Sequence, residues 1–232
     1  MIHFKKFLSL IIPFFSIFFM VYLSLNYNPE KIIFLSLLLT FLASASSAPA
    51  IVIVASKIDE ISAIDVSLVG VFGSLMVLAN YILIIFPSII FYIIPFAAGL
   101  TFYLPTAIIY GTLIKISNKD GVSFGLLLTY GVISEILYPD IFWFPYFLGW
   151  AGMLETTHFL VGKNERNVDY IILGFSYGAI GASLAVCYMM IGWGFYRPLF
   201  MTLPSAIADG ILASLGSLIG SKIGRLAKNI SI

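Results

Sequence analysis

The sequence predicts an all-α protein, built as a bundle of about eight membrane-spanning helices. Its 232 residues are 61% hydrophobic and 10% charged, whereas an ordinary soluble domain is roughly 45–50% apolar and 25% charged. A helix needs about 20 apolar residues to cross the hydrocarbon core of a bilayer, and the chain contains about eight such stretches. Most of the chain is therefore expected to lie in the membrane, which leaves no room for a soluble catalytic domain.

The expected helices are the apolar runs between charged residues and Pro, Gly or Asn breaks. They cover residues 7–25, 32–55, 63–86, 97–116, 121–138, 142–162, 169–192 and 199–227. We group residues 1–60 as a two-helix hairpin and 61–232 as a six-helix core. The segment 88–96 is too short to cross alone, so a loop, a re-entrant turn and a kinked helix start all stay open for it. The small-residue run at 43–50 predicts close helix packing.

The basic residues predict the orientation, because cytoplasmic loops collect Lys and Arg. With the N-terminus inside, the cytoplasmic side receives ten of the twelve basic residues, and only Lys31 and Arg197 lie outside. The ten are Lys5, Lys6, Lys57, Lys115, Lys119, Lys163, Arg166, Lys222, Arg225 and Lys228. This bias predicts a multi-pass protein of the cell membrane with both termini cytoplasmic. The net charge of +1 gives no reason to expect a nucleic acid partner.

Three acidic residues fall within the expected spans: Glu135, Glu155 and Asp209. A carboxyl group in a membrane span is costly unless it is paired, protonated or facing water, so each one is a candidate for function. Glu155 and His158 are three residues apart and share a helix face. Two interpretations remain open for Glu155: a structural hydrogen bond to a neighbouring helix or to His158, or a role in function, including an intramembrane enzyme that also uses Asp209.

No sequence motif predicts an enzyme, a metal site or a cofactor. The spacing Glu155-x-x-His158 occurs in di-iron carboxylate bundles, but those sites need two such motifs and this chain has one. Cys187 is the only cysteine, which excludes an internal disulfide and a cysteine-rich zinc site. The chain has no Walker phosphate loop, nucleophile elbow or HExxH pair, so ATP-driven work would need a partner chain.

Two aromatic segments mark the expected outer face, and they contain all three tryptophans. Their candidate ligand residues are Tyr138, Asp140, Trp143, Tyr146 and Trp150 in one segment and Trp193 and Arg197 in the other, with Glu135 and Asn80 nearby. An interfacial aromatic belt is one explanation, although a belt should also appear on the cytoplasmic side, which is poor in Trp and Tyr. The other is a pocket that stacks a flat, polar or cationic small molecule.

Small residues recur at four-residue spacing in two spans. The last helix carries Gly216, Gly220 and Gly224, and the third carries Gly70 and Ser74. Such rows allow helices to approach closely in lipid, where association depends on packing. They predict either internal helix packing or a docking face for another membrane subunit.

The order of these segments resembles the substrate-capture (S) component of energy-coupling-factor vitamin transporters, of the hydroxymethylpyrimidine/thiamine type. The resemblance covers about residues 63–228: IDVSLVGVFGSLMVLANYIL, PFAAGLTFYLPTAIIYGTLIK, two glutamate-bearing helices around YPDIFWFPYF, and the glycine-rich MTLPSAIADGILASLGSLIGSKIGRLAK. It implies six core helices and a ligand near the outer surface. It also implies a ligand region around Glu135, Tyr138, Trp143 and Tyr146, and a coupling face at Gly70 and Ser74.

The expected function is therefore a membrane-embedded substrate-binding component for uptake of a small solute, such as a vitamin or its precursor. The resemblance implies partners of two kinds: a coupling transmembrane subunit and separate ATPase subunits. The alternative is a noncatalytic integral subunit of a larger membrane complex.

Overall fold

The computed structural model is helical throughout the residues it describes, which are 2–84, 97–139, 143–162 and 166–230, and no strand occurs among them. The α-helices are α1 Ile2–Asn26, α2 Ile32–Ser56, α3 Ala63–Ile84, α5 Leu104–Ser117, α6 Val122–Leu137, α7 Trp143–Val161, α8 Asn167–Gly192 and α9 Leu199–Ile230. Two short 3-10 turns, η1 Pro29–Lys31 and η2 Ile58–Glu60, flank α2. A π-helical turn, η3 Gly99–Tyr103, leads into α5. The all-α prediction is confirmed.

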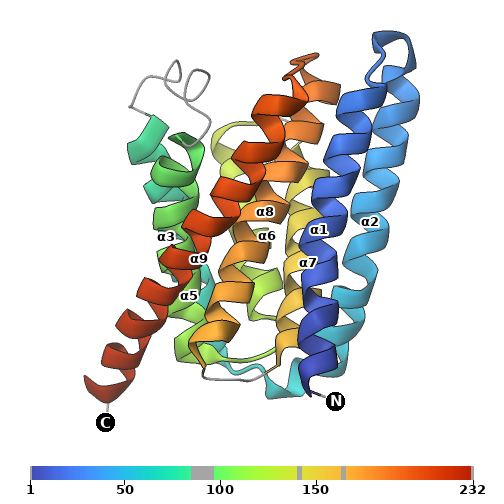
Figure 1. Cartoon of the computed structure of the whole chain (residues 1–232). Coiled ribbons are helices and arrows are strands. Elements are labelled where there is room, and N and C mark those ends of the chain that lie inside the picture. The colour runs from blue at the N-terminus through green and yellow to red at the C-terminus, as the bar shows by residue number, and fades with distance from the viewer. Residues whose placement is uncertain (1, 85–96, 140–142, 163–165, 231–232) are drawn as a thin grey trace.

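Within the described residues, six helical segments are long and apolar enough to cross a membrane. They are Phe4–Asn26, Pro29–Ser56, Ala63–Asn80, Gly99–Ser117, Asn167–Gly192 and Leu199–Asn229. The helix α6 is apolar but has only 16 residues, and α7 carries the polar Glu155 and His158. Successive helices run in opposite directions, so both termini lie at one end of the bundle (Figure 1). We call this the termini end, and the opposite end the far end.

The expected helix limits agree with the observed ones to within a few residues. The clearest difference is in the stretch 97–116, where one regular helix was expected and the structure has the π-helical turn η3 before α5. Single π-helical turns inside helices often mark functional sites. The segment 88–96 lies outside the described residues.

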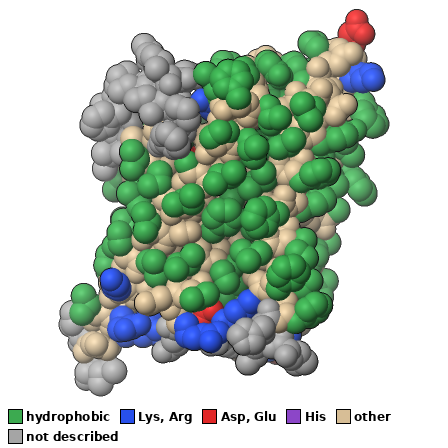
Figure 2. Space-filling model, in the orientation of Figure 1, with side chains coloured by type: hydrophobic (Ala, Val, Ile, Leu, Met, Phe, Trp, Pro, Cys, Tyr) green, Lys and Arg blue, Asp and Glu red, His purple; other side chains and the backbone are tan. Residues whose placement is uncertain are grey.

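The surface seen in Figure 2 is covered by hydrophobic side chains, with Lys and Arg side chains along the edge at the termini end. Several cations there are paired. A buried ion pair joins Lys6 of α1 to Asp169 of α8, and Lys119 lies 2.6 Å from Asp65 of α3. The carboxylate of Glu60, 2.6 Å from Lys57, raises the pKa of Lys57 above its usual value.

The two N-terminal helices pack directly on the core. A Cβ added at Gly149 of α7 would lie 3.0 Å from Ala43 of α2, and one at Gly152 would overlap the backbone at Ser47. The prediction that the small-residue run 43–50 packs closely against another helix is confirmed. Glycine has no Cβ, and this allows the backbones of α2 and α7 to come almost into contact.

The glycines of α9 also lie inside the bundle. A Cβ at Gly216 or Gly220 would overlap a backbone carbonyl oxygen of α5, and one at Gly178 of α8 would overlap the backbone of Asp209. The helix α9 is therefore held against α5 and α8 at backbone distance. The row on α3 is different, since Gly70 has no atom within 4 Å of its Cβ position and Ser74 is exposed.

Candidate ligand-binding site

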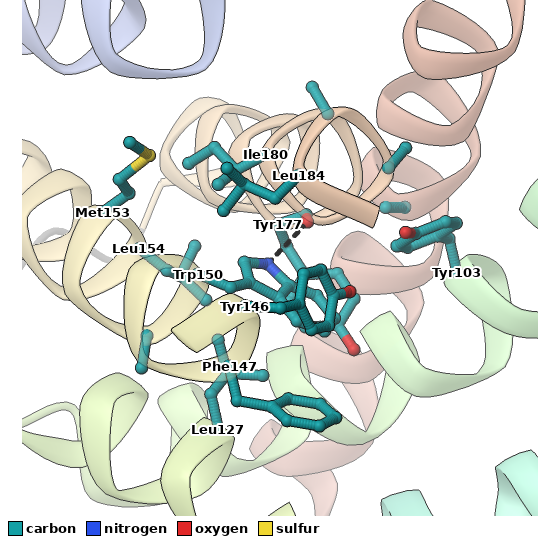
Figure 3. Packing of buried hydrophobic residues seen from close by; sticks show 14 of the residues in the cluster. Tyr103, Leu127, Tyr146, Phe147, Trp150, Met153, Leu154, Tyr177, Ile180 and Leu184 are labelled. Carbon is teal, nitrogen blue, oxygen red and sulfur yellow. Dashed lines mark hydrogen bonds between the residues drawn. The ribbon is translucent and has the colours of Figure 1, made fainter. Parts of the chain in front are cut away.

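Five buried aromatic side chains meet in the interior of the bundle, and we call them the aromatic cluster. They are Tyr103 of η3, Tyr130 of α6, Tyr146 and Trp150 of α7, and Tyr177 of α8. Trp150 is at the centre and is 0% exposed, with ring centroids 5.5 Å from Tyr146, 4.8 Å from Tyr177 and 6.2 Å from Tyr103. These separations are within the range of favourable aromatic pairs, and Figure 3 shows several of these rings directed toward one another.

Local backbone features bring the rings together. A Cβ added at Gly181 of α8 would lie 2.7 Å from the Trp150 ring and 3.0 Å from the Tyr103 ring, so the glycine leaves the room that both rings occupy. The indole Nε1 of Trp150 donates a hydrogen bond to the backbone oxygen of Tyr177 at 3.0 Å (Figure 3). This bond fixes the orientation of the central ring between α7 and α8.

The aromatic cluster continues to the protein surface at the far end. The Trp143 ring lies 4.9 Å from Tyr146 and 5.5 Å from Trp193, and Trp193 is 55% exposed. In the other direction, Tyr110 of α5 stacks on Tyr177 at 5.2 Å. A column of aromatic rings therefore leads from the surface of the far end into the interior.

Asp209 of α9 lies beside this column and is 2% exposed. Its Oδ1 has no hydrogen-bond partner among the described residues, and a Cβ added at Gly99 of η3 would lie 2.7 Å from that oxygen. Ser205 shares a hydrogen bond with the carboxylate, and Tyr103 is close enough to interact with it electrostatically. The π-helical turn and the aromatic cluster thus both adjoin the carboxylate.

Asp209 also has a charged neighbour. Arg197 is near enough to act on the carboxylate electrostatically. The Oδ1 of Asp209 nevertheless has no hydrogen-bond partner among the described residues. Buried polar groups of native proteins are nearly always hydrogen-bonded, so this oxygen indicates a missing partner.

Glu155 has a structural role. Its two carboxylate oxygens accept hydrogen bonds from the backbone N–H groups of Gly121 at 2.7 Å and Phe124 at 3.0 Å, which caps the first turn of α6. A carboxylate is favourable at a helix N-terminus, and Gly121 has a φ of +94° that suits glycine. The interpretation of Glu155 as a hydrogen-bond partner of a neighbouring helix is confirmed.

His158 pairs with α6 rather than with Glu155. Its Nδ1 lies 3.1 Å from the hydroxyl of Ser123, which lies 3.2 Å from the hydroxyl of Tyr110. Among the described residues no group of three or more His, Cys, Asp and Glu side chains is placed to hold a metal ion.

The other sequence candidates lie nearer the far end. Asn80 of α3 donates a hydrogen bond to the Tyr130 hydroxyl at 3.1 Å, which joins α3 to the aromatic cluster. Glu135 and Arg197 are half-buried, whereas Tyr138 is 52% exposed. Asp140 lies outside the described residues.

Sequence reasoning overlooked three members of the aromatic cluster: Tyr103, Tyr130 and Tyr177. Each is a single tyrosine within an apolar stretch, whereas the two segments chosen from the sequence are visibly rich in aromatic residues. The available signal was the hydroxyl itself, because a polar atom inside a membrane span needs a hydrogen-bond partner.

The chain matches no protein-family model, and no curated protein or solved structure is significantly similar to it.

Proposed function

We propose that this protein is the membrane-embedded substrate-binding component of an uptake system for a small organic solute. In this proposal the chain crosses the cell membrane eight times with both termini in the cytoplasm, and ATP is hydrolysed on separate subunits. The topology is supported by the placement of both termini at one end of the bundle (Figure 1) and by the basic residues along that edge (Figure 2).

The observation that carries the proposal is the column of aromatic rings that runs inward from Trp193 and Trp143 to the buried Asp209. Small-molecule sites combine mostly apolar and aromatic linings with a few polar groups that fix orientation. Here the polar groups include the Oδ1 of Asp209, which lacks a hydrogen-bond partner among the described residues, and the tyrosine hydroxyls of the column. An interfacial aromatic belt accounts for Trp193, but it does not account for fully buried rings such as Trp150.

A coupling partner would have an accessible helix face in α3. Ser67, Ser74 and Val71 are exposed, and Gly70 has no neighbouring atom at its Cβ position. Small residues let another transmembrane helix approach closely in lipid. In the proposed assembly this face of α3 contacts the coupling transmembrane subunit.

The direct test is native mass spectrometry of the detergent-purified full-length protein, which should detect a bound small molecule. The released molecule should then raise the thermal unfolding temperature through binding linkage. For Trp143→Ala and for Glu135→Gln, we expect that about ten times more of the released molecule is needed to reach the same rise in unfolding temperature. The matched control is Phe18→Ala, because Phe18 is an aromatic residue of α1 that is 67% exposed. If both site variants keep wild-type affinity, the ligand binds elsewhere.

The same exposed face of α3 supports a second candidate, a noncatalytic subunit of a larger membrane complex. Two observations distinguish the candidates. A monomer that carries a small molecule supports the transport component, whereas stable copurification with other membrane subunits and no small molecule supports the complex subunit. Neighbouring genes for ATPase and coupling subunits, as opposed to respiratory or secretion components, give an independent answer.

A further inference from the structure

We propose that Asp209 binds a protonated amine of the transported solute, with the aromatic cluster surrounding the charged group. The inference rests on the proposed function and specifies the chemical class of ligand for the same site. In this arrangement the ammonium group donates a hydrogen bond to the free Oδ1 of Asp209.

The state of the Asp209 carboxylate carries the first step. The side chain is 2% exposed, and its Oδ1 has no hydrogen-bond partner among the described residues. A carboxylate in the middle of a span is costly unless a partner compensates it. Glu155 shows how this chain satisfies a carboxylate that serves structure, with a backbone donor for each oxygen. Asp209 shares a hydrogen bond with Ser205, but its Oδ1 has no donor among the described residues, and a ligand can supply that donor.

The surrounding rings carry the second step. Tyr103 lies within electrostatic range of Asp209, and its ring is 6.2 Å from Trp150 and 6.3 Å from Tyr177. The face of an aromatic ring attracts cations, and Trp and Tyr do so most strongly. The carboxylate and the rings therefore favour the same sign of ligand charge.

The free Oδ1 carries the third step, because it distinguishes an amine from a cation without N–H groups. This oxygen can accept a hydrogen bond but has no donor among the described residues. A protonated amine has N–H groups that can donate to it, whereas a quaternary ammonium ion has none and would leave the oxygen unsatisfied.

The experiment uses matched probes on the detergent-purified full-length protein, freed of any bound solute. The probes are phenethylamine, its neutral counterpart 2-phenylethanol, and the quaternary ion phenethyltrimethylammonium; tryptamine and tryptophol form a second, larger pair. Thermal unfolding is measured over millimolar concentrations of each. We expect the amines to bind at least about tenfold more tightly than the alcohols and the quaternary ion.

The variant Asp209→Asn should reduce the preference for amine over alcohol to about twofold or less, since it removes the charge and keeps the shape. The control Glu30→Gln removes an exposed carboxylate from η1 and should keep the full preference. Equal affinity for amine and alcohol overturns the inference. So does tighter binding of the quaternary ion, a preference that survives in Asp209→Asn, or a lack of any response to the amines.

The outcomes separate this inference from the proposed function. If a neutral solute copurifies with the protein and stabilises it, the substrate-binding function stands and the assignment of an amine is wrong. If no small molecule copurifies and Trp143→Ala changes no binding, the proposed function itself fails.

Discussion

Glu155 and Asp209 are two buried carboxylates in the same apolar bundle, and their surroundings differ completely. Glu155 is 0% exposed and each of its oxygens accepts a backbone N–H from the first turn of α6. Asp209 is 2% exposed, yet its Oδ1 has no hydrogen-bond partner among the described residues and lies close to the π-helical turn η3. The hydrogen-bond donors around a buried acid, rather than its depth, therefore decide whether its carboxylate serves the structure or is available for a ligand.

The largest effect should follow from removing the structural carboxylate. Glu155→Ala leaves the N–H groups of Gly121 and Phe124 buried without acceptors, and hydrogen bonds to charged groups contribute about 1.5–3 kcal/mol each. We expect a loss of about 4 kcal/mol in unfolding free energy, measured by thermal unfolding in detergent. Glu155→Gln retains one acceptor oxygen and should lose about half as much. A stability equal to wild type for Glu155→Ala would refute the capping role.

A smaller effect should follow from disturbing the backbone that holds Asp209. A Cβ at Gly178 would overlap the backbone of Asp209 and cannot be relieved by a side-chain rotation. We expect Gly178→Ala to cost about 2–3 kcal/mol, as overpacking does, and to lower the yield of monodisperse protein on size-exclusion chromatography. The matched control is Gly70→Ala, which has open space at its Cβ position. Equal losses for the two variants would contradict the observed packing of α8 on α9.

The hydrogen bonds beside the Glu155 cap should matter less. Ser123→Ala removes the hydroxyl that joins His158 to Tyr110 and leaves both side chains without this partner. We expect a loss of about 1–2 kcal/mol in unfolding free energy, measured in the same way. Ser74→Ala serves as the control, since Ser74 is exposed and bonds only to its own helix. A neutral Ser123→Ala variant would mean that His158 and Tyr110 find other partners.

The smallest effect should follow from changing Asp209 in the absence of ligand. Asp209→Asn keeps an acceptor for Ser205 and removes a buried charge whose Oδ1 has no hydrogen-bond partner among the described residues. The unfolding free energy should stay within about 0.5 kcal/mol of wild type or rise. A loss as large as that of Glu155→Gln would show that Asp209 supports the fold, and the contrast between the two carboxylates would disappear.

Much of the fold could be predicted from the sequence because membrane burial leaves a strong signal in one dimension. Apolar runs must be about 20 residues long to cross the bilayer, and the expected span 169–192 therefore closely matches the observed α8 Asn167–Gly192. The π-helical turn at 99–103 could not be predicted, because no residue type there requires it.

The candidate site was predicted less completely. The sequence gave reason to select Trp143, Tyr146 and Trp150 as a group because they lie within eight residues of one another. Tyr103 and Tyr177 come from distant helices, so only helix packing brings them to Trp150. Glycines such as Gly181 govern this approach, and a glycine in a sequence does not indicate which ring will fill the space beside it.

By itself, the sequence determined the all-helical class, the positions of the apolar helices and the short set of acids within them. These properties follow from composition and from the fixed thickness of a bilayer. Only the tertiary structure decided what each acid does, because hydrogen-bond partners are contributed by other helices. Glu155 met the free N–H groups at the start of α6, and Asp209 met aromatic rings and a glycine backbone. Both residues carry a carboxylate within an apolar stretch of sequence. The packing of the helices provided hydrogen-bond donors for Glu155 and left the Oδ1 of Asp209 without one among the described residues.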